Sequence, residues 1–308
     1  MTNSVVRIGV IGAGKFAQAV HIPCFQRVEQ CRVTMVTDRR PELAQQVAAK
    51  FSIPRAGKDP AECAQAAEVD GLIVSAFRWS AGSATRDALE AGKPVFAEKP
   101  MAQTADRAAE LVEAARRSGA PFMIGFMKWY DAGVQLARKL LHEELKDLLG
   151  EVLFARVYCF SRDYEAEFPS VLRTDERRPA GQELWAAAPE WVPAPRAAEY
   201  DWFINRSVHQ VNLIRFLFGD SVTVRHANLA NREGGFVTFE TERHPVVLEV
   251  GTPKLSAWHE GVEIFFQKGR MLVEIPSPLD RSFMARVTVE RGEGASEVKV
   301  FPRRMGWC

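Results

Sequence analysis

The sequence lacks several features that would assign it to a specialised class of protein. No apolar run approaches the roughly 18 residues that cross a membrane. No basic segment followed by a long apolar stretch opens the chain, so we expect no secretory signal. Charge of one sign is not in excess, because 40 Lys and Arg stand against 39 Asp and Glu. This balance gives no reason to expect nucleic acid or an anionic membrane as a partner.

Cysteine is scarce, and motifs for metal binding and for nucleophilic catalysis are missing. Five cysteines, an odd number without CxxC spacing, argue against a disulfide framework or a zinc site. A reducing cytoplasm is the simplest interpretation of this usage. His142, His226, His244 and His259 do not have the spacing of metal ligands, and no nucleophile elbow or Cys–His arrangement is present. We therefore expect no bound metal.

A glycine-rich turn near the N-terminus is the most informative feature that is present. The apolar run from Val5 to Ile11 predicts a buried strand, and it leads directly into the sequence Gly-Ala-Gly-Lys-Phe-Ala. In a Rossmann unit, Gly12 permits the tight turn, Gly14 lets the backbone approach a pyrophosphate, and Ala17 allows close helix–strand packing. Lys15 and Phe16 lie in the same turn, at the start of a predicted helix whose free N–H groups would face the phosphates. The turn thus predicts a dinucleotide site.

The same residues also match the beginning of a phosphate-binding P-loop, Gly-x-x-x-x-Gly-Lys, from Gly9 to Lys15. A P-loop needs Ser or Thr next, to hold Mg²⁺, whereas this chain has Phe16. Gly9 also falls inside the predicted strand. These two differences disfavour a kinase or NTPase.

Asp38 at the end of the second predicted strand bears on the choice of cofactor. A Rossmann unit expects an acidic residue about 20 positions after the glycines, where it hydrogen-bonds the ribose 2′-hydroxyl. A carboxylate there repels a 2′-phosphate and favours NAD. Arg39 and Arg40 follow and could hold that phosphate, so NADP stays an alternative. A simpler hypothesis is that Asp38 caps the turn before Pro41.

The order of predicted elements indicates an α/β protein of two domains. Residues 1–128 alternate apolar strands with helices, which predicts a parallel sheet buried on both faces. Residues 129–308 are dominated by alternating strand patterns, interrupted by a helix from Asn205 to Phe218. They predict an α+β domain with an open, mostly antiparallel sheet. The segment 161–200 is too long for an ordinary connection, and its tryptophans favour an oligomer contact or a loop over a substrate site.

The chain resembles the glucose–fructose oxidoreductase and inositol dehydrogenase (Gfo/Idh/MocA) family across nearly its whole length. The motifs that carry the resemblance, in chain order, are the glycine-rich turn, the Asp-Arg-Arg strand end, A-L-E-A-G-K-P-V-F-A-E-K-P-M-A, G-F-M-K-W-Y-D from Gly125, and H-Q-V-N-L-I-R-F-L-F-G from His209. The resemblance implies a Rossmann domain followed by a mixed α/β domain whose sheet forms subunit contacts. We accordingly expect a homo-oligomer, a dimer or tetramer.

The resemblance also implies where catalysis takes place. Lys99, in the Glu98-Lys99-Pro100 motif, and His209 correspond to the residues that act beside the nicotinamide, and Ser75 and Ala76 to backbone that passes the cofactor. Glu98 is expected to line the cofactor site with them. Lys99 would orient the reacting oxygen and His209 would act as the acid or base, or the roles would be reversed.

Three departures from the family pattern qualify this expectation. Many relatives have Asp four residues before the histidine, whereas this chain has Asn205, which cannot accept a proton but could still hydrogen-bond substrate. The stretch Ser75–Ser83 lacks the Pro and His that are common there. The family's C-terminal helix is expected to be missing, since the sequence ends soon after the last predicted strand.

Simpler structural roles compete with each functional one. A lone lysine at a strand end usually pairs with a neighbour, here Glu98, and a lone histidine on an amphipathic helix is usually a core residue. Lys128 and Trp129 are candidates to contact substrate, but Lys128 could equally extend along the surface. His21 is expected to have a packing role.

The predicted function is NAD(P)-dependent hydride transfer to or from a secondary alcohol or ketone of a sugar, cyclitol or derived metabolite. The substrate partner would be a polyol or ketosugar, with no nucleic acid and no membrane. Two alternatives stay open: a catalytically silent dinucleotide-binding sensor, and a non-sugar reductase similar to biliverdin reductase.

Overall fold

The computed structural model describes residues 5–161, 170–177, 179, 183–229, 234–255, 257–280, 283–292 and, for the backbone, 296–302. Within these ranges the chain forms two compact units: 5–125 with 170–201, and 126–161 with 202–302. The chain first passes from one unit to the other after Gly125, close to the expected boundary at 128. The segment 170–201, however, packs with the first unit.

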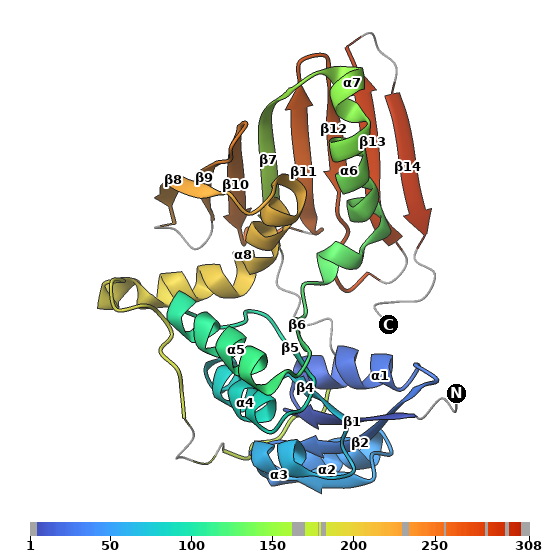
Figure 1. Cartoon of the computed structure of the whole chain (residues 1–308), viewed down its shortest axis with the longest axis vertical. Coiled ribbons are helices and arrows are strands. Elements are labelled where there is room, and N and C mark those ends of the chain that lie inside the picture. Colours follow the sequence, from blue (N-terminus) through green and yellow to red (C-terminus); the bar gives the residue numbers. More distant parts are fainter. Residues whose placement is uncertain are drawn as a thin grey trace. The chain divides into compact units, whose positions relative to one another are not determined.

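The first unit contains a six-stranded sheet in the order β3-β2-β1-β4-β5-β6, with every neighbouring pair parallel (Figure 1). Its strands are β1 (Val6–Ile11), β2 (Cys31–Thr37), β3 (Arg55–Gly57), β4 (Gly71–Val74), β5 (Val95–Ala97) and β6 (Phe122–Ile124). All four residues of β4 are buried, as expected for a central strand covered on both faces. The predicted parallel Rossmann sheet is confirmed, and the structure adds the strand order 3-2-1-4-5-6.

The helices of the first unit follow the predicted alternation, with differences at several ends. They are α1 (Ile22–Phe25), α2 (Pro41–Lys50), α3 (Pro60–Gln65), α4 (Arg78–Glu90) and α5 (Ala105–Ser118). α5 begins after Thr104, because the Thr104 hydroxyl accepts a hydrogen bond from the Arg107 N–H, and it ends at Gly119 with φ of 68°. α4 begins at Arg78, directly after Phe77. The Phe77 carbonyl accepts the Ser80 N–H and hydroxyl and so closes its first turn.

The second unit contains an eight-stranded sheet in the order β14-β13-β12-β11-β7-β10-β9-β8. Its strands are β7 (Val152–Phe160), β8 (Thr223–Asn228), β9 (Gly234–Glu240), β10 (Pro245–Gly251), β11 (His259–Phe266), β12 (Gly269–Glu274), β13 (Phe283–Arg291) and β14 (Ser296–Pro302). β7 and β10 run parallel and all other neighbours antiparallel, which confirms the predicted mostly antiparallel sheet.

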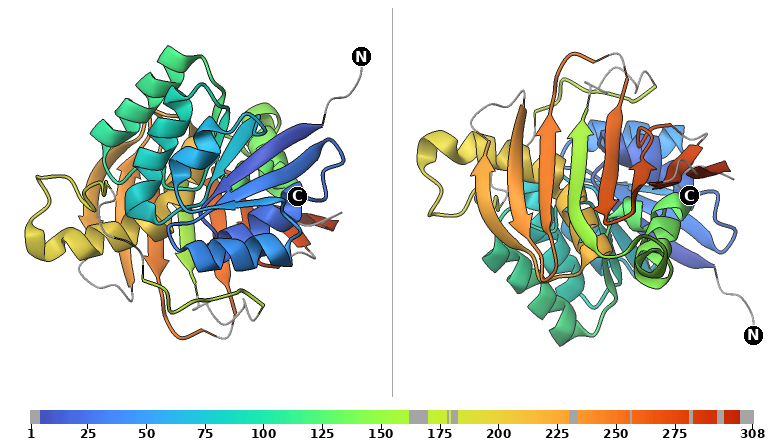
Figure 2. Two further views of the ribbon diagram at one scale, coloured as in Figure 1. Left: turned by 90° about the horizontal axis from the view of Figure 1, so that it is seen from below. Right: turned by 90° about the horizontal axis from the view of Figure 1, so that it is seen from above.

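Three helices cover one face of this sheet and enclose the core of the second unit (Figure 2). They are α6 (Ala132–Glu143), α7 (Leu145–Leu149) and α8 (Ala197–Phe218), with a 3-10 turn, η2 (Met127–Tyr130), before α6 and another, η4 (Ala194–Arg196), before α8. Leu213, Ile214 and Leu217 of α8 are buried against sheet residues such as Val157 and Val262. α8 begins eight residues before the predicted Asn205, and its first turn belongs to the first unit.

The segment 170–201 is held on the first unit by both polar and apolar contacts. The Gln18 side chain bonds the backbone of Leu172 twice, accepting from its N–H at 2.8 Å and donating to its carbonyl at 3.1 Å. The Trp185 ring is buried against Gly82 of α4, where a Cβ would come within 2.1 Å of it. The Arg107 guanidinium lies 4.9 Å from the centre of the same ring. These contacts explain why the segment packs with the first unit, a connection that sequence analysis did not predict.

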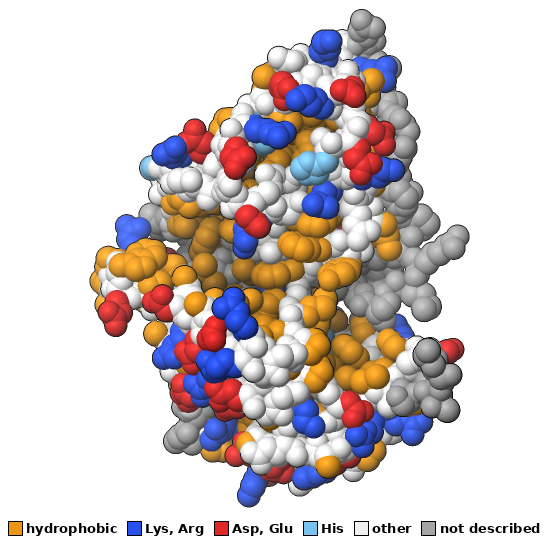
Figure 3. All heavy atoms as spheres, viewed as in Figure 1, with side chains coloured by type: hydrophobic (Ala, Val, Ile, Leu, Met, Phe, Trp, Pro, Cys, Tyr) orange, Lys and Arg blue, Asp and Glu red, His pale blue; other side chains and the backbone are white. Residues whose placement is uncertain are grey.

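Charges and membrane-spanning potential agree with the composition. On the face shown in Figure 3, basic and acidic side chains are interspersed. Among the residues that the structure describes, no helix combines the length and apolarity that crossing a membrane requires.

Candidate active site

The glycine-rich turn is fixed between the carboxyl ends of three parallel strands. The Gly12 N–H donates to the Thr37 carbonyl at 2.7 Å, and the Ser75 N–H donates to the Ile11 carbonyl at 2.8 Å. Gly12 has φ of 100°, and a Cβ there would lie 2.3 Å from the Ser75 carbonyl oxygen. Glycine is therefore required at position 12 both for its conformation and for this close approach.

Gly14 is glycine for a different reason. A Cβ at Gly14 would have no protein atom within 4 Å, so the surrounding protein does not demand its absence. The backbone after it is helical from Lys15 through Phe25, with a π-helical turn over Ala17–His21. Ala17 is fully buried, as predicted for its packing role. Bare backbone beside open space at the start of a helical segment fits the pyrophosphate of a dinucleotide.

The Asp38 carboxylate lies against this turn. It accepts the Ala13 N–H at 2.9 Å, the Arg40 N–H at 2.9 Å, and two guanidinium bonds from Arg40 at 2.9 and 3.0 Å. Burial raises the pKa of Asp38, but the bonds from Arg40 and Ala13 outweigh burial and lower it overall. The Arg40 N–H bond fits the hypothesis that Asp38 caps the turn before α2, and its hydrogen bond to a ribose hydroxyl stays a prediction. Arg39 follows in the same turn.

Glu98 and Lys99 follow β5 at the same edge of the sheet. The Glu98 N–H donates to the Val74 carbonyl at 2.9 Å, and its carboxylate accepts from the Lys99 N–H at 3.1 Å. His21 Nε2 lies 2.8 Å from Glu98 Oε1. Burial raises the pKa of Glu98, but the His21 hydrogen bond and the charges of His21 and Lys99 lower it overall. His21, expected to have a packing role, therefore links the helix after the turn to the Glu98-Lys99 segment.

In the second unit, α8 and η2 carry the remaining predicted residues. Asn205 and His209 lie one turn apart on α8, which places them on one side of the helix. Phe126, just before η2, packs edge-on against His209, with ring centres 6.4 Å apart. Trp129 of η2 stacks on Phe216 of α8 at 4.7 Å. The segment around η2 therefore packs along the part of α8 that carries His209.

Lys128 of η2 does not extend along the surface. Its side chain is 6% exposed, and its ammonium lies 2.8 Å from Oε2 of Glu260, whose side chain is fully buried. The hypothesis that Lys128 reaches along the surface is wrong, because Glu260 holds the lysine inside the second unit. Its predicted contact with substrate stays a prediction.

Sequence reasoning missed two carboxylates that have defined partners in the structure. Glu260 is one, although it shares the core-facing register of β11 with Val262 and Ile264; a charge at such a position indicates a buried partner. Glu176 is the other: its carboxylate accepts the N–H groups of Glu42 and Leu43 in the first turn of α2. No signal in the sequence connects Glu176 with that helix. Within the described ranges, no group of His, Cys, Asp and Glu side chains is arranged to hold a metal ion.

Comparison with known proteins agrees with this geometry. The family model described as "Oxidoreductase family, NAD-binding Rossmann fold" matches residues 6–126. The chain is 35% identical over 164 residues to an inositol 2-dehydrogenase/D-chiro-inositol 3-dehydrogenase of Shouchella clausii, which covers 52% of this chain and 46% of that protein. It is 25% identical over 254 residues to an inositol 2-dehydrogenase of Klebsiella pneumoniae, covering 79% and 66%. The matched region thus spans between about half and two thirds of these relatives.

Solved structures show the same fold. KijD10, a 3-ketoreductase from Actinomadura kijaniata in complex with NADP and TDP-benzene, has a TM-score of 0.74 at 20% identity, covering 97% of this chain and 85% of that one. The WlbA dehydrogenase from Bordetella pertussis, in complex with NADH and UDP-GlcNAcA, has a TM-score of 0.69 at 20% identity, covering 89% and 75%.

The fold and the glycine-rich site define a dinucleotide-binding protein of the Rossmann class. Within that class, residues 6–126 match the model of the Gfo/Idh/MocA oxidoreductases, and the chain is similar to inositol dehydrogenases over part of their length.

Proposed function

We propose that this protein is an NAD(P)-dependent oxidoreductase that transfers a hydride between the nicotinamide and a secondary alcohol or ketone of a sugar, cyclitol or related metabolite. The observation that carries the proposal is the glycine-rich turn, with open space beside Gly14 and the Asp38 carboxylate against Ala13. Inositol dehydrogenases among the relatives support a polyol substrate.

The first unit supplies the cofactor site in this proposal. Gly12, Gly14 and Ala17 form the turn that would receive the pyrophosphate, with Lys15 and Phe16 at the start of the helical segment. Asp38 would accept the ribose hydroxyl, with Arg39 beside it, and Ser75, Ala76 and Glu98 would line the nicotinamide side. When bound, the nicotinamide supplies a hydride acceptor or donor. We propose NAD as the preferred cofactor because the Asp38 carboxylate would repel a 2′-phosphate.

The protein supplies the proton chemistry. Oxidation of an alcohol needs a base for the hydroxyl proton, and reduction of a ketone needs the same group as an acid. His209 is assigned this role because an imidazole ordinarily changes charge near neutral pH. Lys99 donates a hydrogen bond to the reacting oxygen, and Asn205 hydrogen-bonds a neighbouring hydroxyl. Lys128 and Trp129 belong to the same proposal as contacts to substrate.

Two single variants test these assignments against the sensor alternative. With NAD⁺ and a panel of cyclitols and aldoses, absorbance of the reduced cofactor at 340 nm measures turnover. We expect Lys99→Ala and His209→Ala each to lower kcat about 100-fold or more. Tryptophan fluorescence should still report NAD⁺ binding by both variants. Wild-type binding without turnover of any panel member would instead favour the sensor.

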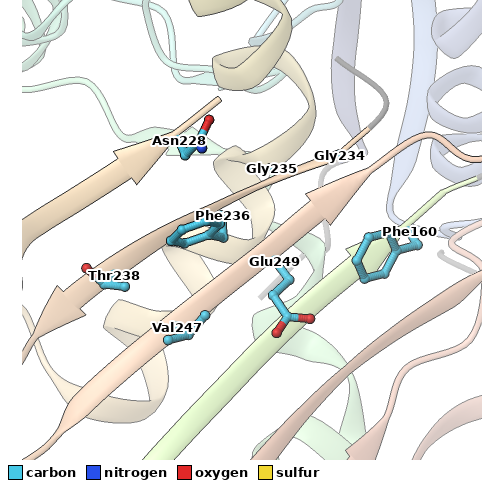
Figure 4. A pocket seen from close by; sticks show the side chains of 8 residues that line it. All are labelled: Phe160, Asn228, Gly234, Gly235, Phe236, Thr238, Val247 and Glu249. Atoms are coloured by element: carbon cyan, nitrogen blue, oxygen red, sulfur yellow. The ribbon is translucent and has the colours of Figure 1, made fainter. Parts of the chain in front are cut away.

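Self-association through the second sheet belongs to the proposal as well. The sheet face opposite α6, α7 and α8 has a hollow of about 610 Å³, lined by Phe160, Asn228, Gly234, Gly235, Phe236, Thr238, Val247 and Glu249 (Figure 4). On this face Arg156 lies between Glu249 and Glu263, so charges alternate across strands. Such a face can pair with a copy of itself. Light scattering of the purified protein should show a dimer or tetramer in place of a monomer. We also propose a cytoplasmic location, because the cysteine usage favours a reducing compartment.

A further inference from the structure

The second unit contains a buried polar cluster centred on a carboxylate to which the proposed chemistry assigns no role. At its centre is Glu260 of β11, whose fully buried carboxylate accepts three hydrogen bonds. Oε2 accepts from the Lys128 ammonium at 2.8 Å and from the Trp258 indole N–H at 2.9 Å. Oε1 accepts from the Gln210 amide at 2.5 Å. A buried ion pair is costly to desolvate and is weak evidence of stabilisation, so its presence calls for another explanation.

The three donors come from different elements, and Glu260 joins them to the sheet. Lys128 belongs to η2, Gln210 to α8, and Trp258 directly precedes β11. β11 itself is held between β7 and β12 in the middle of the sheet. One carboxylate therefore fixes both η2 and α8 to the most constrained part of this unit.

Gln210 is the residue that follows His209. Gln210 is 2% exposed, and the hydrogen bond that its side-chain amide donates to Glu260 fixes the rotation of α8 at that turn. On the other side, Phe126 packs edge-on against the His209 ring. Lys128, two residues after Phe126, is tied to the same carboxylate. The positions of the His209 imidazole and of the Phe126 ring that packs on it thus both depend on Glu260.

We infer that Glu260, acting through Gln210 and Lys128, is a positioning residue that sets where the His209 imidazole lies. This inference rests on the proposed function of His209 as the proton-handling group. A displacement of about 1 Å in a catalytic group can cost about 100-fold in rate. Loss of the hydrogen bonds to Glu260 should therefore lower kcat without removing the proton-handling group itself.

Gln210→Met is the sharpest variant, because it removes the amide while leaving the Lys128–Glu260 ion pair intact and the side-chain volume similar. The matched control is Gln135→Met: Gln135 donates to the Trp129 carbonyl of the same 3-10 turn at 3.0 Å, but from an exposed position. We expect Gln210→Met to lower kcat about 10- to 100-fold. The KM for NAD⁺ should stay within about twofold of wild type, and the pH–rate profile should keep its ionisation, since His209 is still present. Gln135→Met should behave as wild type.

A second measurement does not depend on turnover. The ¹⁵N and ¹H signals of the His209 ring, assigned by their loss in His209→Asn, should shift or broaden in Gln210→Met and not in Gln135→Met. Glu260→Gln combined with Lys128→Met, which removes both buried charges, should produce the same shift. If the wild type proves inactive while Gln210→Met still moves the His209 signals, the proposed function fails and the positioning inference holds. Unchanged His209 signals together with wild-type kcat in Gln210→Met would overturn the inference.

Discussion

Replacing Asp38 with alanine should change which dinucleotide the protein prefers. In the structure the Asp38 carboxylate bonds the Ala13 N–H within the glycine-rich turn and holds the Arg40 guanidinium at 2.9 and 3.0 Å. If this carboxylate also accepts a ribose hydroxyl, Asp38→Ala removes one charge-assisted hydrogen bond to NAD⁺. Such a bond is worth about 1.5 to 3 kcal/mol, which corresponds to a Kd about 10 to 150 times higher.

The same substitution should not weaken NADP⁺. It removes the anion that repels a 2′-phosphate and releases Arg40 from its partner, so the Kd for NADP⁺ should be unchanged or lower. The ratio of the two constants should therefore shift toward NADP⁺ by at least about tenfold. Isothermal titration with each cofactor measures both constants.

A matched control is available at the opposite edge of the sheet. Asp70 also pairs with an arginine, Arg7, whose guanidinium lies 2.6 Å away, near the start of β1 and β4. Asp70→Ala should leave both cofactor constants unchanged. An Asp38→Ala variant with the wild-type ratio of NAD⁺ to NADP⁺ affinity would refute the assignment of Asp38 to the ribose.

The other predictions concern glycine positions and pH. Gly82→Ala places a Cβ 2.1 Å from the Trp185 ring, so we expect a loss of about 1 to 3 kcal/mol in the free energy of unfolding, measured by urea, with cofactor affinity unchanged. Gly14→Ala, with no protein atom within 4 Å of its Cβ, should show the reverse: wild-type stability in urea and weaker cofactor binding. Hydrogen bonding from Arg7 lowers the pKa of Asp70 to about 2, below the unfolded value of about 3.9. The ionised Asp70 therefore contributes to stability above about pH 4, and this contribution is lost as the pH falls toward 2. The wild type should therefore lose more thermal stability than Asp70→Asn between pH 5 and 2, by a small amount because the pair is exposed; parallel melting curves would contradict this.

Local signals predicted the first sheet because each element there is specified by its own residues. The apolar run before Gly12 indicated a buried strand, and the alternation of apolar strands with helices over residues 1–128 indicated a parallel sheet. β3 and α3 were missed, although Asp59 and Glu62 form a capping box that marks the start of α3. A three-residue strand such as β3 has too few positions to show a periodic pattern.

Parts of the site that depend on distant contacts could not be predicted from local sequence. The Trp185 ring packs where Gly82, far away in the chain, leaves room for it. Lys128 and Glu260 are separated by 132 residues, and nothing around Lys128 distinguishes a buried lysine from one that lies on the surface. The alternation along β11 could have indicated a buried acid at Glu260, but not which cation would pair with it. The proton-handling assignments of Lys99 and His209 come from resemblance to a family.

Transfer of a labelled hydrogen distinguishes a dehydrogenase from a protein that only binds the dinucleotide. The wild type would be incubated with NAD⁺ and cyclitols or sugars that carry deuterium on the carbinol carbons, and the reduced cofactor would be analysed by mass spectrometry. We expect reduced nicotinamide that carries one deuterium and forms in step with the ketone product. The rate of its formation should be about 100-fold or more lower in His209→Ala. NAD⁺ binding without deuterium transfer from any substrate of the panel would contradict this expectation.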